Sequence, residues 1–436
     1  MTVAIHSVAV IGGGTMGSGI AALAASVGCE VLLLDVDQAA VARGLQRALA
    51  TAATPDEAAL LKSRIATGTI DGDLPRIENS DWICEAIIED LSAKRDLFET
   101  IEAARRQDSV VSTNTSGIRL SEIVAGLPLR LREDIVVTHF FNPVRVMRLL
   151  ELVPGAETRP EVVAAFETFG RERLGKGVVR AKDTVNFIAN RIGCFFMLSG
   201  LHKAEPFLKQ GLSQETVDAL LGAPVGLPST GLYGLIDLIG LDVMDLVGRN
   251  LEANLPAGDA GRAFARFPEA ERTMLARRQL GRKTSGGFYR MTKTADGGKL
   301  KEVFDLTSGA WRPAVEPKLP ARRADPVSLV FIDDAAARLV WDTLGGTLLY
   351  AADLVPEIAE NIVAVDRAMR WGFAWRRGPF ELLDDLEPER VIDRLRREGK
   401  PLPRRLAALA AAGAQSFYRD GAFLGVDGRY RRVPAE

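Results

Sequence analysis

The chain has 436 residues, of which 47% are hydrophobic and 26% charged, and its formal net charge is -2. This composition is typical of a soluble globular protein with several domains, and so small a charge gives no reason to expect a nucleic-acid partner. No uncharged apolar run reaches the length of a membrane span, and the N-terminus lacks the basic region of a signal peptide. The three cysteines are scattered and form no metal motif. We therefore expect a cytoplasmic protein without a metal site or a membrane span.

A glycine-rich turn follows the first strand-like run, residues 7–11, and precedes an alanine-rich, helix-like segment, residues 18–27. The turn consists of Gly12, Gly13, Gly14, Thr15, Met16 and Gly17. Its G-x-G-x-x-G spacing is typical of dinucleotide sites: Gly12 allows a tight turn, Gly14 lets the backbone approach a pyrophosphate, and Gly17 lets the helix pack closely. The turn, with Thr15 and Met16, is predicted to hold phosphates at the helix N-terminus. A purely structural turn is the alternative.

A second strand, residues 30–34, ends in Asp35 at the distance from the glycine turn where a ribose-binding carboxylate is expected. A carboxylate there accepts hydrogen bonds from the adenosine ribose hydroxyls and repels a 2′-phosphate. Because no arginine follows directly to reverse this preference, the sequence predicts NAD rather than NADP.

Further strands alternate with helices, which is typical of a doubly wound parallel sheet. These strands are predicted at residues 82–88, 109–112 and 135–138. Since the carboxyl ends of parallel strands share one edge, we expect Glu89, Ser116 and His139 to gather beside the glycine turn.

His139 stands between a strand and an Asn-Pro turn at residues 142–143, and Glu151 lies in a second apolar run, residues 148–153. If this run returns beside the first, the carboxylate reaches the imidazole. A histidine can take a proton from an alcohol near neutral pH, and a carboxylate partner fixes its tautomer. The alternatives are a histidine that caps a strand, a glutamate on an edge strand, and a helix-capping role for Ser116.

With these residues in place, the chain resembles the L-3-hydroxyacyl-CoA dehydrogenase family, closest to the dehydrogenase part of fused bacterial fatty-acid β-oxidation proteins. The resemblance is carried by Gly12 to Gly17, Asp35, Glu85 to Glu89, Lys94, Asn114 to Ser116, His139 to Pro143, Glu151, and Lys182 to Arg191. It implies NAD-dependent oxidation of L-3-hydroxyacyl-CoA to 3-ketoacyl-CoA in fatty-acid β-oxidation.

By this resemblance, His139 is the general base and Glu151 its carboxylate partner. Ser116 and Asn190 would hydrogen-bond the substrate oxygen, and Asn142 would help to hold the site.

The same resemblance places Glu89, Lys94 and Asn114 in the cofactor site, with the first two at the nicotinamide ribose. One departure is Val185-Asn186, which stands where the family usually has Pro-Gly at its interdomain hinge. A CoA-binding lysine is not assigned, and Lys62 is the one candidate.

The predicted fold class is α/β plus all-α, with a Rossmann-like domain followed by two tandem helical domains. Its predicted parts are an NAD-binding domain at 1–182, a first helical domain at 183–291, a linker at 292–326 and a second helical copy at 327–436. The duplication is inferred because residues 365–384 repeat the pattern of residues 217–237. A tandem copy would cover within one chain the surface that single-copy relatives use to dimerise, so we expect a monomer or pseudo-dimer.

The resemblance implies an acyl-CoA substrate and separate enoyl-CoA hydratase and thiolase partners, because the fused relatives continue into a hydratase domain that this chain lacks. Two alternatives stay open. The same fold could act on another 3-hydroxy substrate, by forming 3-hydroxybutyryl-CoA reductively or by using a free hydroxy acid. The chain could also be a silent scaffold module of a β-oxidation complex.

Overall fold

The computed structural model describes residues 4–294, 296–317, 319 and 326–436. The chain forms two compact units. The first comprises Met1–Ile188 with Ile358–Glu360 and Glu436, and the second comprises Ala189–Glu357 and Asn361–Ala435. None of the described helices is long and apolar enough to cross a membrane.

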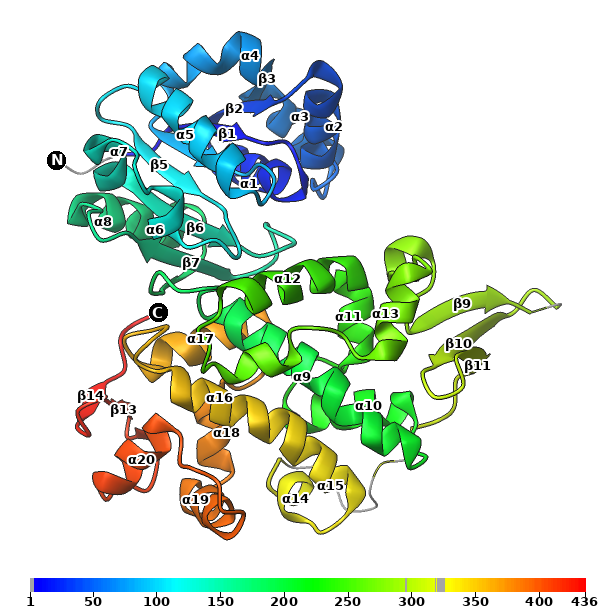
Figure 1. Cartoon of the computed structure of the whole chain (residues 1–436). Helices are drawn as coiled ribbons and strands as arrows, with labels where there is room; N and C mark the ends of the chain where they lie inside the picture. Colours follow the sequence, from blue (N-terminus) through cyan, green and yellow to red (C-terminus); the bar gives the residue numbers. More distant parts are fainter. Residues whose placement is uncertain (1–3, 295, 318, 320–325) are drawn as a thin grey trace. The chain divides into compact units, whose positions relative to one another are not determined.

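The first unit is built on one eight-stranded sheet with the order β3-β2-β1-β4-β5-β6-β7-β8 (Figure 1). Its strands are β1 (Ser7–Ile11), β2 (Glu30–Asp35), β3 (Ile65–Thr69), β4 (Trp82–Glu85), β5 (Val110–Thr113), β6 (Ile135–Phe140), β7 (Leu149–Pro154) and β8 (Gly177–Arg180). The strands from β1 to β6 are parallel, whereas β7 pairs antiparallel with β6 and parallel with β8. The predicted doubly wound parallel sheet is therefore confirmed, with the last two strands reversed.

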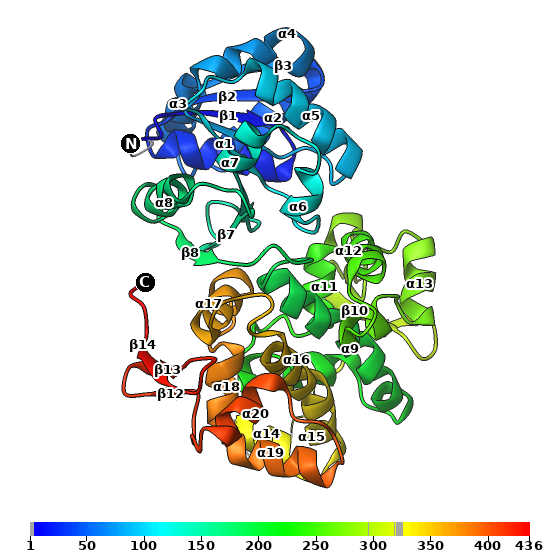
Figure 2. The same ribbon diagram turned by 60° about the vertical axis from the view of Figure 1, so that its left-hand side comes forward.

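Helices connect and cover these strands (Figure 2). They are α1 (Thr15–Ser26), α2 (Gln38–Leu49), α3 (Pro55–Arg64), α4 (Ile70–Asp73), η1 (Leu74–Asn79), α5 (Leu91–Ala104), α6 (Leu120–Ile123), α7 (Leu129–Asp134), α8 (Pro160–Thr168) and η2 (Phe169–Arg173). Side chains cap several of them: Asp37, Thr54 and Asp90 accept a hydrogen bond from the first turns of α2, α3 and α5, respectively.

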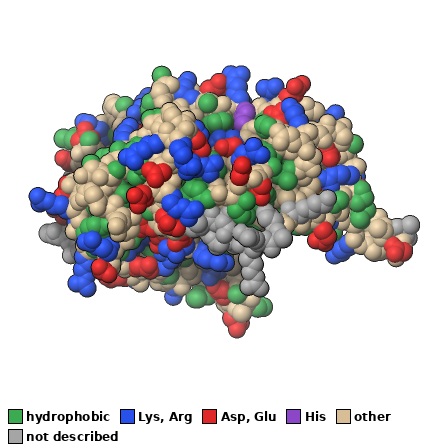
Figure 3. Space-filling model, turned by 90° about the horizontal axis from the view of Figure 1, so that it is seen from below, with side chains coloured by type: hydrophobic (Ala, Val, Ile, Leu, Met, Phe, Trp, Pro, Cys, Tyr) green, Lys and Arg blue, Asp and Glu red, His purple; other side chains and the backbone are tan. Residues whose placement is uncertain are grey.

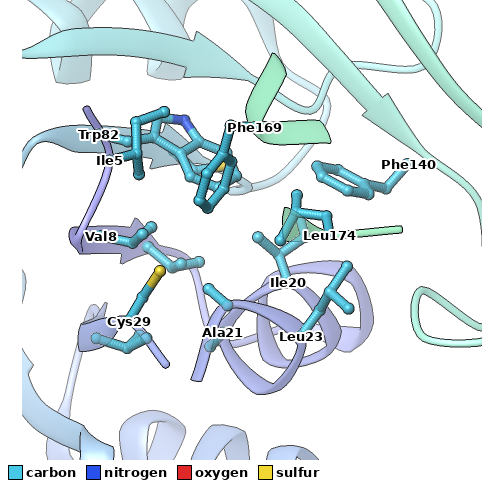
Figure 4. Close-up of a cluster of buried hydrophobic side chains, with 14 of the residues drawn as sticks. Ile5, Val8, Ile20, Ala21, Leu23, Cys29, Trp82, Phe140, Phe169 and Leu174 are labelled. Carbon is cyan, nitrogen blue, oxygen red and sulfur yellow. The ribbon is translucent and has the colours of Figure 1, made fainter. Parts of the chain in front are cut away.

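The core of the first unit gathers around Trp82 on β4 (Figure 4). Its ring meets Phe166 and Phe169 edge-on, with centroids 5.6 and 5.9 Å apart. Helix α1 packs into the same cluster through small side chains such as Ala21. Because α1 is nearly all buried, the turn between β1 and α1 is fixed at both ends.

The second unit begins with a helical half. Its helices are α9 (Ala189–Lys209), α10 (Gln214–Leu220), η3 (Ala223–Val225), α11 (Tyr233–Ile239), α12 (Leu241–Asn254), η4 (Ala260–Phe264), α13 (Glu269–Ala276) and η5 (Arg282–Thr284). A small antiparallel sheet follows, with strands β9 (Tyr289–Lys293), β10 (Lys299–Asp305) and β11 (Ala310–Pro313).

This small sheet corrects the prediction that residues 292–326 are a linker. The side chains of Val303 and Phe304 on β10 are buried, and Phe304 packs edge-on against Trp311 with ring centroids 5.4 Å apart. Residues 295, 318 and 320–325 of the predicted linker lie outside the described residues. The stretch up to Pro313 is therefore largely a packed part of the second unit.

A second helical half completes this unit. Its elements are α14 (Pro326–Phe331), α15 (Ala335–Val340), η6 (Trp341–Gly345), α16 (Gly346–Leu354), α17 (Ile362–Gly372), α18 (Pro379–Asp385), α19 (Pro388–Arg397), α20 (Arg404–Ala411), β12 (Tyr418–Arg419), β13 (Ala422–Leu424) and β14 (Tyr430–Arg432).

The two halves repeat one hydrogen-bond pattern around a buried aspartate. In the first half, Asp218 accepts bonds of 2.7 Å from the Tyr289 hydroxyl and of 2.7 Å from the first amide of α11. In the second half, Asp366 accepts bonds of 2.6 Å from the Tyr418 hydroxyl and of 2.8 Å from an amide in the first turn of α18. The halves thus share a local design that their sequences show only weakly.

Basic and acidic side chains are interspersed on the face seen in Figure 3. In the arginine-rich C-terminal segment, Arg394 pairs with Glu398 at 2.7 Å and lies over the ring of Trp341. Arg405 is buried and donates to the backbone carbonyls of Leu424 and Gly425. These two arginines therefore serve packing within the second unit.

Candidate active site

The glycine turn leaves room for a phosphate-bearing ligand. A Cβ atom at Gly12, which has φ of +106°, would lie 2.4 Å from the Ala86 carbonyl oxygen, and one at Gly17 would lie 1.8 Å from the Gly12 carbonyl oxygen. A Cβ at Gly14 would meet nothing within 4 Å. Gly14 therefore faces open space directly before the first residue of α1, where the helix N-terminus favours anions. These residues fit the pyrophosphate of a dinucleotide.

The predicted ribose-binding carboxylate lies beside this turn. Asp35 accepts a 2.8 Å hydrogen bond from the Gly13 amide. The Gly13 carbonyl in turn accepts bonds from the Ser18 hydroxyl at 2.8 Å and from Arg47 Nη1 at 3.1 Å. Both ends of the Gly13 residue are thus held, and Arg47, on α2, is a member of this site that the sequence analysis missed.

A buried ion pair forms at the end of β4, between Glu85 and Lys94. Lys94, with a side chain 1% exposed, contacts Glu85 at 2.7 Å and Glu89 at 3.3 Å. Glu85 is fully buried and also accepts bonds from the Thr113 hydroxyl at 2.5 Å and the Ile87 amide at 2.8 Å. The structure places Lys94, predicted as a cofactor contact, as the partner of these two carboxylates.

Glu89 shapes the loop that follows β5. Its carboxylate accepts bonds from the Thr115 hydroxyl at 2.7 Å and from the amides of Ser116 and Gly117 at 2.8 and 2.9 Å. Burial works against its charge, but the Lys94 ammonium and the loop donors outweigh this and lower the pKa of Glu89. Glu89 therefore remains ionised and fixes the backbone at Ser116, whose side chain is exposed.

Asn114 has a structural contact at the same edge. Its side-chain oxygen accepts a 3.0 Å bond from the Phe140 amide, so it joins the ends of β5 and β6. It is 7% exposed. Thr15 is exposed and Met16 half-buried at the start of α1.

His139 and Glu151 face each other across the antiparallel pair β6 and β7, where they are register partners. His139 Nδ1 lies 2.7 Å from Glu151 Oε2, and the residues are 2% and 0% exposed. The other carboxylate oxygen accepts a 3.1 Å bond from the Ile188 amide. The imidazole packs near the rings of Phe141 and Phe187, at centroid distances of 4.4 and 5.6 Å. Glu151 thus holds Nδ1, and Nε2 is the nitrogen that can exchange a proton with a ligand.

The turn after His139 is fastened by a lysine that the sequence analysis did not single out. Lys176 is buried and donates to the carbonyls of Val144 and Met147. Burial lowers the pKa of Lys176 to about 8. Asn142, in this turn, is exposed. Asn190 belongs to the second unit, where it is half-buried and is the second residue of α9.

A glycine turn with a carboxylate beside it, on a sheet that carries a buried histidine–glutamate pair, defines a dinucleotide-binding dehydrogenase as the class of protein. Comparison with protein families gives the particular family. Residues 7–184 match the 3-hydroxyacyl-CoA dehydrogenase NAD binding domain, and residues 187–291 match the 3-hydroxyacyl-CoA dehydrogenase C-terminal domain.

Individual relatives agree with this match. A probable 3-hydroxyacyl-CoA dehydrogenase of Bacillus subtilis is 35% identical over 98% of this chain and 57% of the relative. A putative fatty acid oxidation complex trifunctional enzyme of Rickettsia felis is 35% identical over 87% of this chain and 53% of the relative. A probable 3-hydroxyacyl-CoA dehydrogenase of Deinococcus radiodurans is 36% identical over 74% of this chain and 91% of the relative.

The chain belongs to the 3-hydroxyacyl-CoA dehydrogenase family, whose members are oxidoreductases with an NAD-binding first domain. The predicted family, the Rossmann-like domain followed by a helical domain, and the NAD cofactor are thereby confirmed. The chain spans little more than half the length of the Bacillus and Rickettsia relatives.

Proposed function

We propose that this protein oxidises L-3-hydroxyacyl-CoA to 3-ketoacyl-CoA in fatty-acid β-oxidation, with NAD as the hydride acceptor. The observation that carries the proposal is the buried contact of 2.7 Å between His139 and Glu151, on the sheet that also bears the glycine turn. Bound NAD supplies the acceptor for the hydride that leaves C3 of the substrate.

In this proposal, His139 is the general base. Its Nε2 takes the proton of the 3-hydroxyl group, since Nδ1 is already held by Glu151. The Glu151 carboxylate keeps the tautomer that has Nε2 free of a proton, and it stabilises the imidazolium once the proton has arrived. Burial of both groups strengthens this electrostatic contribution, because little water screens it.

The remaining site residues would orient the two ligands. We assign Ser116 and Asn190 to the substrate oxygen and Asn142 to the walls of the site. The cofactor contacts would be Gly12, Gly14, Thr15, Met16, Gly17, Asp35, Glu89, Lys94 and Asn114. The contacts of Lys94 and Asn114 favour an indirect role for both residues. Lys94 pairs with Glu85 and Glu89, and the Asn114 side chain bonds the β6 backbone.

The test is NADH formation, followed by its absorbance, with NAD and L-3-hydroxybutyryl-CoA or a longer homologue. We expect His139→Ala to lower kcat by about 100- to 10,000-fold, as general-base loss usually does. Glu151→Gln should lower kcat by a similar or smaller factor, because the amide cannot stabilise the imidazolium by charge. His202→Ala is the control, since His202 lies in the second unit and bonds the Arg266 carbonyl.

Full activity of His139→Ala would refute the proposed base. Turnover of a free hydroxy acid in preference to the acyl-CoA would move the protein to another 3-hydroxy substrate. Absence of turnover in the wild type, with NADH still bound, would favour the scaffold role.

We also propose that the second helical half is a tandem copy of the first. The repeated aspartate–tyrosine pattern at Asp218–Tyr289 and Asp366–Tyr418 supports this proposal. A copy within the chain would make a monomer or pseudo-dimer, and light scattering that shows an obligate dimer would contradict it. A separate proposal concerns the partners. We propose that enoyl-CoA hydratase and thiolase activities come from other domains or chains, as the name of the trifunctional Rickettsia relative suggests.

A further inference from the structure

The start of α9 is anchored by a buried arginine, Arg191, whose side chain is 1% exposed. Arg191 Nε donates a 2.6 Å hydrogen bond to the Tyr350 hydroxyl, and its Nη2 forms an ion pair with Asp259. The Tyr350 hydroxyl donates in turn to Asp259 at 2.9 Å. Burial raises the pKa of Tyr350 well above its usual value, so the hydroxyl keeps the proton that it donates. The three side chains thus bond one another, and Glu357 Oε1 also lies 3.7 Å from Arg191 Nη2.

Two of these side chains belong to the first helical half, whereas Tyr350 lies on α16 of the second half. Further contacts join α9 to the second half over the next two turns. The rings of Phe195 and Tyr350 are stacked, with centroids 4.0 Å apart and planes at 13°. A Cβ at Gly193 would lie 2.1 Å from the ring of Phe373, so these two residues are in close contact.

We infer that the second helical half holds the start of α9 through Tyr350, and that Tyr350 is thereby a positioning residue for Asn190. Asn190 directly precedes Arg191, so fixing the guanidinium fixes the backbone from which the Asn190 side chain projects. This inference rests on the proposed function, in which Asn190 bonds the substrate oxygen. It gives the second half a role in the reaction although no residue of that half is placed in the active site.

The physical reason is the sensitivity of catalysis to position. Asn190 stands in the first turn of α9, where a helix lacks its full set of backbone hydrogen bonds and frays most easily. Two residues shortly before α9, Asn186 and Phe187, have φ of +61° and +53°, so the helix does not continue backward past Ala189. A clamp on Arg191 compensates for this weak end, and a displacement of about 1 Å can cost roughly 100-fold in rate.

The experiment compares Tyr350→Phe with the matched variant Tyr418→Phe. Each removes one buried hydroxyl that donates to an aspartate, but Tyr418 bonds Asp366 instead of the α9 network. We expect Tyr350→Phe to lower kcat about 10- to 100-fold with little change in NADH affinity. Tyr418→Phe should leave kcat within about twofold.

A double-mutant cycle separates positioning from a general structural role. If Tyr350 acts through Asn190, then Tyr350→Phe should have no further effect on kcat in an Asn190→Ala background. An equal loss of kcat in both backgrounds, or a kcat of Tyr350→Phe equal to that of Tyr418→Phe, would overturn the inference.

Hydrogen exchange of the amides at residues 189–196 provides a readout that does not depend on turnover. Tyr350→Phe should speed this exchange and Tyr418→Phe should not. If the wild type shows no turnover, the proposed function fails, and this comparison alone decides the clamp. Equal exchange in the two variants would then refute it.

Discussion

Removing the ammonium of Lys94 should destabilise the first unit strongly. In Lys94→Met, the Glu85 carboxylate stays fully buried and retains two of its donors, the Thr113 hydroxyl at 2.5 Å and the Ile87 amide at 2.8 Å. Two hydrogen bonds do not replace a neutralising charge at 2.7 Å. Breaking a buried ion pair on one side typically costs about 3–5 kcal/mol, so we expect a loss of that size.

The double variant Lys94→Met/Glu85→Gln should recover most of this loss. It removes both charges together, and the desolvation of a buried pair largely offsets its attraction. The coupling free energy equals the recovered loss plus the cost of Glu85→Gln alone, so we expect it to be about 2–4 kcal/mol. Arg180→Met is the control, because Arg180 is 55% exposed where it pairs with Glu167, and loss of such a surface pair should cost less than about 1 kcal/mol.

Native-state hydrogen exchange of the β4 and β5 amides is the appropriate assay. A chain of two compact units does not guarantee a single unfolding transition, whereas exchange of these amides reports the free energy of opening the first unit itself. The reasoning would be refuted if Lys94→Met lost less than about 1 kcal/mol of opening free energy. It would also be refuted if the loss in the double variant exceeded the sum of the losses in the two single variants.

Three further predictions concern the glycine turn, its arginine and a buried glutamate. Gly14→Ala should fold normally but bind NADH more weakly, while Gly17→Ala should unfold because its Cβ would lie 1.8 Å from a carbonyl oxygen; thermal melts and fluorescence titration with NADH would check both. Arg47→Met should weaken NADH binding about two- to tenfold, the value of one hydrogen bond, and unchanged affinity in the same titration would contradict this. Burial raises the pKa of Glu271 to about 7 from 4.5, so between these values the native state keeps a proton that the unfolded state has lost. Compared with Glu271→Gln, the wild type should therefore lose roughly 3 kcal/mol of unfolding free energy as the pH rises through this window. Native-state hydrogen exchange of the second-unit amides in both proteins at several pH values, corrected for the intrinsic exchange rate at each pH, would test it, and parallel pH profiles of the opening free energy would contradict it.

The parts of the site that lie in continuous sequence patterns could be predicted. The glycine turn and Asp35 follow a strand at fixed distances, and the structure places them side by side through the Gly13 amide. The contact between Glu151 and His139 was predicted on the condition that the strand carrying Glu151 returns beside the strand carrying His139. That returning strand is present as β7. These features depend on spacing within one or two elements, which a sequence shows directly.

Other features depend on pairing between distant elements. Strand β3 has only two buried residues and contains Gly68, so it has no long apolar run, and it forms because it pairs with β2. The signal for the buried pair was Glu85, a charged residue within the apolar run at residues 82–88. Its partner Lys94 could be recognised only from the position of α5 beside β4. The strand β10 was hidden because the proline-rich residues that follow it made the whole stretch resemble a linker.

The contact between His139 and Glu151 depends on how side chains pack on the opposite face of strands β6 and β7. Side chains alternate along a strand, so a slip of one residue between β6 and β7 would turn Glu151 away from His139. On β7, Leu150 and Leu152 resist such a slip, because both are buried in the cluster around Trp82 and would be turned out of it. On β6, the neighbours of His139 are also held. The Thr138 hydroxyl bonds Ser112 of β5 at 2.8 Å, and Phe140 is buried in the cluster around Trp82. Packing on one face thus sets the register that brings the two polar side chains together on the other.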